Sequence, residues 1–243
     1  MRLLSYNIHK GIGGNDRRYR LERVCHVIEH ENPDLILLQE VTRDAPNCGR
    51  DDQPCLLAER MAFEQSMYQL NVSWKVGGYG NLLLSRWPIV EKHQISLQLK
   101  TKKPRGAQIA IVDTPEGRIK VVNVHLGLSE SERKWQVSHL LHHAAFRECA
   151  DLPELIVGDF NDWRNQLVRG PFAEHGFAQI TTPPSRFRSF PAYFPLGSLD
   201  KAFCRQGIGI HEVRIVGGAD ARRASDHRPL VIDFHLVTKP SDA

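Results

Sequence analysis

The order of hydrophobic and polar residues along the chain predicts strands and helices in turn. Residues 3–8 form a short apolar run, and residues 34–41 form a nearly continuous one, which is typical of strands covered on both faces. Between these runs, residues 20–31 carry apolar side chains at the i, i+3, i+4, i+7 spacing of one helix face. Pro33 is expected to end this helix. The chain therefore opens with a strand–helix–strand pattern.

The pattern then changes from helices to a strand-rich stretch. A second helix is predicted over residues 53–69, capped by Asp51 or Asp52, and sequential strands are predicted over residues 72–126. Residues 129–132 (Ser-Glu-Ser-Glu) have the form of a capping box and predict another helix start. The buried stripe of that helix is expected to consist of Val137, Leu140, Leu141 and Ala144. Four more strands are expected at residues 155–158, 199–204, 211–216 and 229–236. Strands and helices interleave to the end, which predicts an α/β (α+β) fold.

Length and composition are those of an ordinary globular protein. The chain has 243 residues, of which 41% are hydrophobic and 25% charged, with a formal net charge of +4. We expect one catalytic domain over residues 1–237 and a flexible tail over residues 238–243. The positive charge is too small to indicate a dedicated nucleic-acid binder.

The termini and the cysteines bear on location. The N-terminus enters a strand pattern directly, and no apolar run of about 18 residues is present, so neither a signal peptide nor a membrane span is predicted. The five cysteines are scattered without CxxC spacing, which disfavours a disulfide scaffold or a zinc knuckle. A bridge between Cys48 and Cys55 is the minor alternative. We expect a cytoplasmic monomer without an obligate protein partner or a membrane span.

Candidate chemistry gathers at the ends of the predicted strands. Asp159 and Asn161 follow the apolar strand 155–158 two residues apart, and in an extended backbone such positions point to the same side. Other strands end in the same kinds of residue, namely Asn7, Glu40, His125, Asp200, Asp226 and His227. Carboxylates, amides and imidazoles together indicate metal-assisted hydrolysis, most simply of a phosphate ester.

Simpler interpretations exist for each motif alone. Asp159 and Asn161 could form a mere turn, because Asp and Asn are common in turns. The run from Ser225 to His227 could suggest a serine hydrolase, but three neighbours in a loop rarely meet through their side chains. A catalytically silent phosphate-binding protein is the alternative from a different class. Such a protein would usually have lost a carboxylate or an imidazole, and none of the motifs is broken.

Six motifs occur in an order that resembles the endonuclease/exonuclease/phosphatase superfamily, and in particular a bacterial branch of it. They are Tyr6-Asn7-Ile8, Leu38-Gln39-Glu40-Val41, Asn123-Val124-His125-Leu126, Gly158-Asp159-Phe160-Asn161, Leu199-Asp200 and Ser225-Asp226-His227. The superfamily includes deoxyribonucleases, neutral sphingomyelinases and inositol-polyphosphate 5-phosphatases. The resemblance implies a four-layer sandwich of two packed mixed β-sheets flanked by helices. It also implies Mg²⁺-dependent hydrolysis of a phosphodiester, with Mn²⁺ as a substitute.

The resemblance also implies roles for the motif residues. Glu40, Asn7 and Asp226 would hold the metal, because Mg²⁺ prefers oxygen ligands. Asp159 would orient and deprotonate the attacking water, and Asn161 would hold that water or a phosphoryl oxygen.

Two histidines complete the implied catalytic set. His227, held by Asp200, would face the scissile phosphate as an imidazolium. His125 would donate to a phosphoryl oxygen or to the leaving group. The apurinic-endonuclease branch has a tyrosine near this place, so His125 favours the nuclease, sphingomyelinase and 5-phosphatase branches.

Basic and aromatic residues near the predicted strand ends are candidates for contact with the substrate. Arg105 and Arg223 could bind phosphates, and Trp163 and Tyr193 could stack on a substrate. Within residues 186–196 arginines alternate with aromatic residues, of which about half are expected to pack inside the fold. Nucleic acid or a nucleotide-like diester is the leading expectation. A phospholipid, another small phosphodiester or a phosphomonoester is the alternative.

Overall fold

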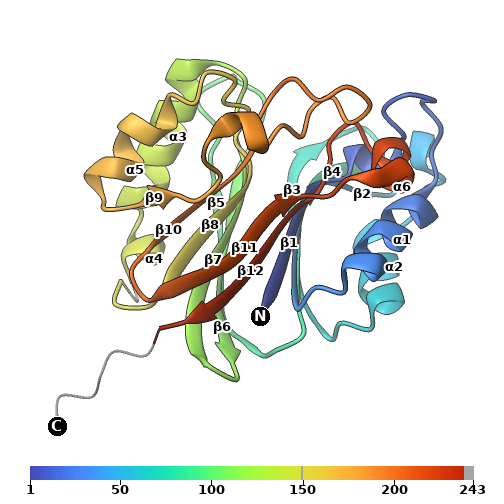
Figure 1. Cartoon of the computed structure of the whole chain (residues 1–243). Coiled ribbons are helices and arrows are strands. Elements are labelled where there is room, and N and C mark those ends of the chain that lie inside the picture. The colour runs from blue at the N-terminus through green and yellow to red at the C-terminus, as the bar shows by residue number, and fades with distance from the viewer. Residues whose placement is uncertain (149, 238–243) are drawn as a thin grey trace, which may run out of the picture.

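The computed structural model describes residues 1–148 and 150–237. Two mixed six-stranded sheets pack face to face, and helices cover both outer faces, which gives four layers (Figure 1). The predicted four-layer sandwich of two mixed β-sheets is therefore confirmed. The predicted tail, residues 238–243, lies outside the described residues.

The first sheet contains the strands nearest both ends of the described chain. Its strand order is β11 (Ile208–Ile215), β12 (Leu230–Leu236), β1 (Arg2–Asn7), β2 (Leu35–Arg43), β4 (Gly78–Ser85) and β3 (Gln65–Ser73). The outer face of this sheet is covered by α1 (Leu21–Glu31), α2 (Gln53–Met61) and α6 (Gly218–Ala224) (Figure 1).

The second sheet is built from the middle of the chain. Its strand order is β5 (Ile89–Ser96), β6 (Gly106–Thr114), β7 (Gly117–His125), β8 (Glu154–Asp159), β10 (Asp200–Arg205) and β9 (Ala178–Gln179). Its outer face is covered by α3 (Glu130–His142), α4 (Ala144–Arg147) and α5 (Pro171–Glu174) (Figure 1). In the described residues, short 3₁₀ turns lie in the connections at His9–Gly11, Pro46–Cys48, Leu167–Arg169 and Pro184–Arg186.

The core between the two sheets is apolar at its base and polar beneath the strand ends. Leu35 and Leu37 of the first sheet pack with Val121 and Val157 of the second. Nearer the strand ends, buried amides cross the interface. Gln39 Nε2 donates to Asn123 Oδ1 at 2.7 Å, and Asn123 Nδ2 donates to the backbone oxygen of Leu38 at 3.1 Å. Because buried amides are costly to leave unpaired, these bonds fix how the two sheets meet.

One predicted helix is wrong in its extent. Helix α2 ends at Met61 because Ala62 takes the left-handed conformation, with φ of 55°, and residues 65–73 form strand β3 instead. The predicted Asp52 cap is present, since its side chain accepts a hydrogen bond from Cys55 N. The helix pattern over 53–69 failed because β3 is an edge strand with a weakly alternating pattern, which resembles a helix face.

Two smaller predictions about helix α3 also need correction. Ser129 is the N-cap residue, as expected, but its side chain makes no capping hydrogen bond. Glu132 is buried against Gly127 and accepts a hydrogen bond from Gln136 Nε2 at 3.4 Å, so it does not close a capping box. Ala144, which we expected in the buried stripe, lies beyond the helix end and is exposed.

Two findings concern the cysteines and membrane-spanning helices in the part of the chain that the structure describes. Cys25, Cys48, Cys55 and Cys204 are free, so the minor alternative of a Cys48–Cys55 bridge is wrong. Within the same residues, no helix is long and apolar enough to cross a membrane.

Candidate active site

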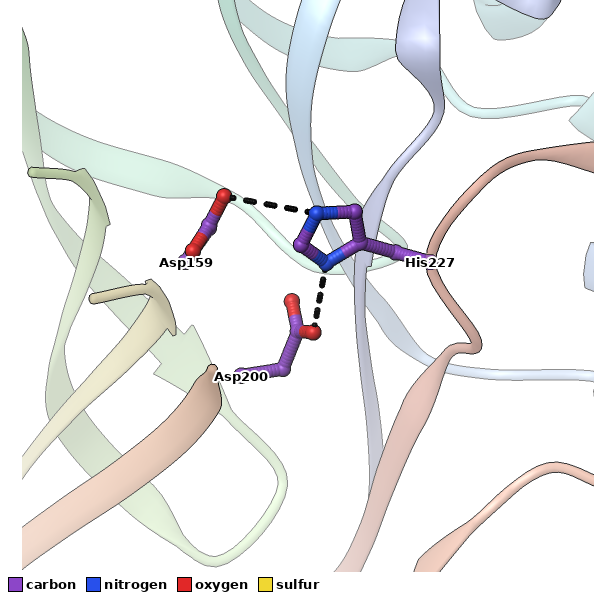
Figure 2. Close-up of side chains that lie close together, drawn as sticks. All are labelled: Asp159, Asp200 and His227. Atoms are coloured by element: carbon purple, nitrogen blue, oxygen red, sulfur yellow. Dashed lines mark hydrogen bonds and ion pairs between the residues drawn. The ribbon is translucent and has the colours of Figure 1, made fainter. Parts of the chain in front are cut away.

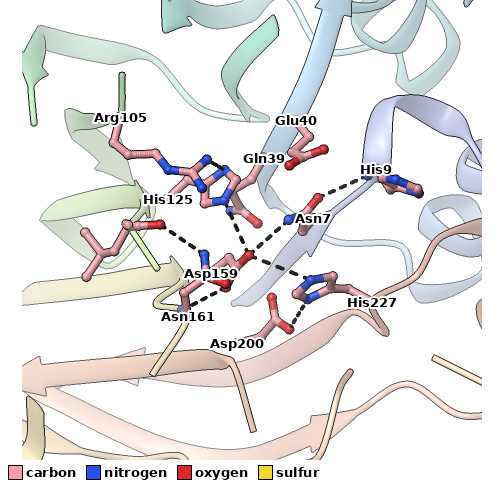
Figure 3. A network of polar contacts seen from close by, with 12 residues as sticks. Asn7, His9, Gln39, Glu40, Arg105, His125, Asp159, Asn161, Asp200 and His227 are labelled. Carbon is pink, nitrogen blue, oxygen red and sulfur yellow. Dashed lines mark hydrogen bonds and ion pairs between the residues drawn. The ribbon is translucent and has the colours of Figure 1, made fainter. Parts of the chain in front are cut away.

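Strand register brings the predicted catalytic side chains to one end of the sandwich. In the second sheet, Asp159 is the register partner of His125 on the parallel strand β7 and of Asp200 on the antiparallel strand β10. In the first sheet, Asn7 of β1 is the register partner of Gln39 on the parallel strand β2. The site therefore joins the strand ends of both sheets, and each sheet supplies part of it (Figure 3).

The backbone around Asp159 is shaped by a glycine. Gly158 has φ of 152°, and a Cβ atom there would lie 1.9 Å from the backbone oxygen of Val124. Only glycine fits so close to β7, and this contact sets Asp159 beside His125. Asn161, with φ of 51°, turns the chain back so that its N–H donates to Asp159 Oδ1 at 3.0 Å. Its side chain donates to the backbone oxygen of Leu126 at 3.0 Å.

Backbone with positive φ also shapes the part of the site that the first sheet contributes, opposite Asp159. The pairing of β2 with β4 shifts between Leu38 and Val41, and Glu40 inside this bulge has φ of 56°. Bulges re-aim side chains next to active sites, and non-glycine residues with positive φ persist where the surroundings hold them. His9 and Lys10 are also left-handed, with φ of 45° and 64°. The Lys10 ammonium forms an ion pair with the Glu40 carboxylate.

Asp159 is the hub of the polar network. It is 1% exposed, and its Oδ2 atom accepts a hydrogen bond from Asn7 Nδ2 at 3.0 Å (Figure 3). The same oxygen lies 3.5 Å from Nε2 of His125 and 3.8 Å from Nε2 of His227. Burial raises the pKa of Asp159 to about 6, although the charge of His227 opposes the shift. A carboxyl with such a pKa can take up and release a proton near neutral pH.

His227 is held as an imidazolium. Its Nδ1–H donates to Asp200 Oδ2 at 2.8 Å, and both residues are buried (Figure 2). Burial disfavours the charge, but the carboxylates of Asp200 and Asp159 outweigh it and raise the pKa of His227 to about 10. At neutral pH the site therefore presents a fixed positive charge directed at Asp159.

His125 is neutral, in contrast to His227. Arg105 donates from Nη1 to His125 Nδ1 at 3.3 Å, and since a guanidinium only donates, Nδ1 is the accepting nitrogen. Burial and then the charge of Arg105 lower the pKa of His125 well below its ordinary value. The proton of His125 is thus on Nε2, which faces Asp159. The two histidines offer one neutral and one cationic donor to the same point.

Two sets of side chains come into question as metal ligands. In the described residues, Asp159, Asp200 and His227 form the one group of three acidic, histidine or cysteine side chains with ligand atoms within 4.8 Å of one another. Their mutual hydrogen bond and the raised pKa of His227 suit a proton network better than a metal cage. Glu40 is different. Burial opposes its charge, but Lys10 lowers its pKa, so an ionised carboxylate faces a cation there.

The chemistry of Glu40 and its neighbours fits a hard divalent cation. Mg²⁺ takes carboxylate and amide oxygens and retains several waters. Asn7 lies on the adjoining strand, and its Oδ1 atom accepts from His9 N at 3.1 Å. Asp226 lies on the other side of His9, with Oδ2 3.8 Å from His9 Nδ1. The Asn7 amide and the Asp226 carboxylate therefore both lie next to His9, and the Glu40 carboxylate pairs with the neighbouring Lys10.

The predicted substrate-binding residues fall into two groups. Arg105 reaches the centre of the site through His125, whereas Arg223 is exposed on α6. Trp163 is exposed, but its ring packs edge-on against the Phe190 ring, with 5.9 Å between the ring centroids. The centroid of the Phe190 ring in turn lies 4.8 Å from that of the His227 ring. Tyr193 is exposed in the loop that follows Phe190. The structure therefore brings Arg105 to the centre and leaves Arg223, Trp163 and Tyr193 at the periphery.

Three contributors were missed in the sequence. His9 and Lys10 contact the proposed metal ligands Asp226 and Glu40. Their closeness to Asn7 in the sequence could have drawn attention to them. The third is Ser225, whose hydroxyl donates to the backbone oxygen of Asn7 at 2.7 Å. This bond joins the loop carrying His227 to strand β1, and the proton of the Ser225 hydroxyl is used in it. The expectation that residues 225–227 are not a serine triad agrees with this geometry.

The four-layer fold places a buried carboxylate–imidazole cluster at one end of its two sheets. A family model for the endonuclease/exonuclease/phosphatase family matches residues 4–227. The chain belongs to this family, whose enzymes are hydrolases of phosphoester bonds and generally depend on a divalent metal.

The chain is also similar to individual proteins. The uncharacterised protein YbhP of Escherichia coli (strain K12) is 30% identical over 250 residues, covering 97% of this chain and 96% of its own. A crystal structure of an endonuclease/exonuclease/phosphatase from Beutenbergia cavernae superposes with a TM-score of 0.77 at 24% identity, covering 97% of this chain and 71% of that chain. Mannosyl-6-phosphatase Bt3783 from Bacteroides thetaiotaomicron superposes with a TM-score of 0.74 at 16% identity, covering 96% and 99%. At these identities the two structures show the fold alone.

Proposed function

We propose that the chain is a Mg²⁺-dependent phosphodiesterase in which water attacks the phosphorus in line with the leaving oxygen. The observation that carries the proposal is the presence of two histidines beside Asp159, of which His125 is neutral and His227 is cationic. A phosphodiester has one negative charge, and its hydrolysis builds further charge on the phosphoryl and leaving oxygens. A neutral N–H donor and an imidazolium, both buried, are suited to bind that charge.

Asp159 would orient the attacking water and take its proton as the new P–O bond forms. Its pKa of about 6 leaves the carboxylate ionised at neutral pH but basic enough to accept a proton. Asn161 would help to hold the water or a phosphoryl oxygen from the same turn. As the bond to the leaving group breaks, the imidazolium of His227 would stabilise the negative charge that develops.

Glu40, Asn7 and Asp226 would hold the divalent ion. When bound, the ion neutralises charge on the phosphoryl oxygens and the leaving group. Lys10 already supplies a positive charge at Glu40, so the carboxylate is kept ionised and oriented. Mn²⁺, which accepts the same oxygen ligands, would substitute.

The proposed ligand role of Glu40 can be tested by metal titration. The variant Glu40→Gln keeps the shape of the side chain and removes its charge, so the apparent Mg²⁺ affinity should fall at least about tenfold. Calorimetric binding of Mg²⁺ and the metal dependence of bis(4-nitrophenyl) phosphate hydrolysis would measure it. Glu174→Gln, at an exposed position on α5, is the matched control. An unchanged titration of Glu40→Gln would remove this residue from the ligand set.

The preference for diesters over monoesters is tested by a direct comparison. Bis(4-nitrophenyl) phosphate and 4-nitrophenyl phosphate differ in the second ester group, and hydrolysis of the diester should be the faster reaction. The outcome would be reversed if the enzyme were a phosphomonoesterase. EDTA should abolish either activity, and restoration by Mg²⁺ or Mn²⁺ completes the control.

Nucleic acid is a specific candidate for the substrate. Lys100, Lys102 and Lys103 are exposed in the connection that leads to Arg105, where they could follow a phosphate backbone. Cleavage of DNA or RNA that depends on such contacts falls steeply between low and physiological salt. Activity that is insensitive to salt would exclude a polyanion and leave a small diester or a lipid.

A further inference from the structure

Large apolar side chains stand exposed on the rim of the site beside His227. Five of them are more than half exposed, namely Leu128 (72%), Phe194 (65%), Tyr193 (57%), Leu196 (57%) and Trp163 (56%). They come from two connections after strands of the second sheet and from the loop before β10. We call these five side chains the apolar rim. Soluble proteins rarely expose such a cluster unless it binds something.

The loop that carries three of these side chains is well ordered by hydrogen bonds. Backbone N–H groups of Phe190 and Gly197 donate to each other's carbonyl oxygens, at 3.1 and 2.8 Å, and close the loop at its base. Ala192 N donates to the backbone oxygen of Asp226 at 2.7 Å, which ties the loop to the segment that carries His227. These bonds hold the loop over residues 190–197, which we call the platform, in one conformation. The exposure of Tyr193, Phe194 and Leu196 is therefore a property of the folded state.

Trp163 packs against the loop that carries Tyr193, Phe194 and Leu196, and polar contacts lead from its neighbour Asp162 to the backbone of Leu128. The Trp163 ring lies on Gly197, where a Cβ atom would be 2.8 Å from Cζ3 of the tryptophan. Next to Trp163, Asp162 pairs with Arg133 at 3.6 Å, and Arg133 donates from Nη1 to the backbone oxygen of Leu128 at 2.6 Å. Phe190 lies under the platform, between Trp163 and His227. The surface thus borders the site on the side of the imidazolium.

Arginines are interleaved with the apolar rim. Arg164 follows Trp163 directly and is exposed, and Arg188 is exposed at the base of the platform. Arg228 donates from Nε to the backbone oxygen of Ala192 at 2.7 Å. A positively charged surface with protruding aromatic and aliphatic side chains is complementary to an anionic lipid bilayer. There the apolar groups enter the headgroup region and the guanidinium groups meet lipid phosphates.

We propose that the apolar rim docks the enzyme on bilayers that contain anionic phospholipid, so that the phosphodiester of a lipid headgroup enters the site beside His227. This inference rests on the proposed phosphodiesterase function and narrows its substrate class to membrane lipids. Leu128 and Leu196 distinguish a bilayer from an unpaired nucleic-acid strand, because bases stack on aromatic faces and gain little from aliphatic tips.

The test compares vesicle binding and hydrolysis in the same variants. The double variant Phe194→Asp, Leu196→Asp places charge at the tip of the platform, away from the catalytic contacts. Leu56→Asp, at an exposed position on α2, is the matched control. Co-sedimentation would use vesicles of phosphatidylcholine alone and of phosphatidylcholine mixed with phosphatidylglycerol. Hydrolysis of bis(4-nitrophenyl) phosphate would report the catalytic centre without a membrane.

The wild type and Leu56→Asp should bind the mixed vesicles more tightly than the neutral ones. The rim variant should lose at least about tenfold in partitioning to the mixed vesicles while hydrolysing the soluble diester at the normal rate. Absence of binding by the wild type, or equal binding by the rim variant, would overturn the proposal. So would a rim variant that loses binding of single-stranded DNA with vesicle binding unchanged. Vesicle binding without any diester hydrolysis would instead support the docking surface and refute the proposed function.

Discussion

Replacing Asp159 by asparagine should lower kcat for a phosphodiester by at least about 10²-fold. The amide keeps the shape of the side chain, so Asn7 and Asn161 retain a neighbour, but it cannot take a proton from water. It also removes the carboxylate that faces both histidines. In terms of activation free energy the loss is at least about 2.7 kcal/mol.

Steady-state kinetics with bis(4-nitrophenyl) phosphate at saturating Mg²⁺ would measure this effect. Circular dichroism and the thermal transition of the variant should show the native fold, because Asp159→Asn is nearly isosteric. Asp113→Asn, at an exposed position on β6, is the matched control and should keep normal activity. Full activity of Asp159→Asn would remove Asp159 from the role of base.

Replacing Asp200 by asparagine should change both the rate and its dependence on pH. In the wild type, the Asp200 and Asp159 carboxylates overcome burial and raise the pKa of His227 to about 10. The imidazolium therefore persists below that pH and is lost only as the pH rises through it. Without the charge of Asp200, burial dominates and the pKa of His227 falls. At pH 8 the variant would have a neutral imidazole, and kcat should drop about 10²-fold.

The pH profile separates this explanation from simple misfolding. In Asp200→Asn the fall of kcat/KM on the alkaline side should begin at a lower pH. The loss of activity relative to the wild type should therefore become smaller as the pH approaches the lowered pKa of His227. Nitrogen NMR of the His227 ring would follow its protonation directly. His227→Gln should lose the rate at every pH, because no imidazolium can form. An Asp200→Asn profile that is lower by the same factor at all pH values would contradict the electrostatic role.

Much of the fold could be predicted because its strands are buried on both faces. Strands β2 and β8 contain apolar runs, and the amphipathic stripe of α1 is equally clear. The edge strand β3 was misassigned to a helix, since it buries few side chains and begins soon after α2 ends. The open capping box could not be foreseen, because the Glu132 side chain is buried against Gly127 and bonded to Gln136 rather than turned toward Ser129.

The candidate site was predictable in its members but not in its electrostatics. Asp159, His125 and His227 stand out in the sequence because each follows or precedes an apolar strand. Nothing in the sequence shows that His125 is neutral and His227 charged, since this depends on Arg105 and Asp200 as three-dimensional neighbours. The Lys10–Glu40 ion pair was hidden for the same reason. About half of the aromatics in residues 186–196 were expected to pack, and Phe187 is buried whereas Tyr193 and Phe194 are exposed.

The division of the site between two sheets has a consequence for how the enzyme loses activity. His125 and Asp159 belong to one sheet and Asn7 and Glu40 to the other, joined across the interface by the Gln39–Asn123 hydrogen bond. A slip of one sheet over the other by a fraction of a strand spacing would separate Asn7 from Asp159 while both sheets stay intact. Heat or mild denaturant should therefore inactivate the enzyme before its secondary structure melts. Enzymatic activity would then respond to a misalignment of the two sheets earlier than the spectroscopic signal of secondary structure does.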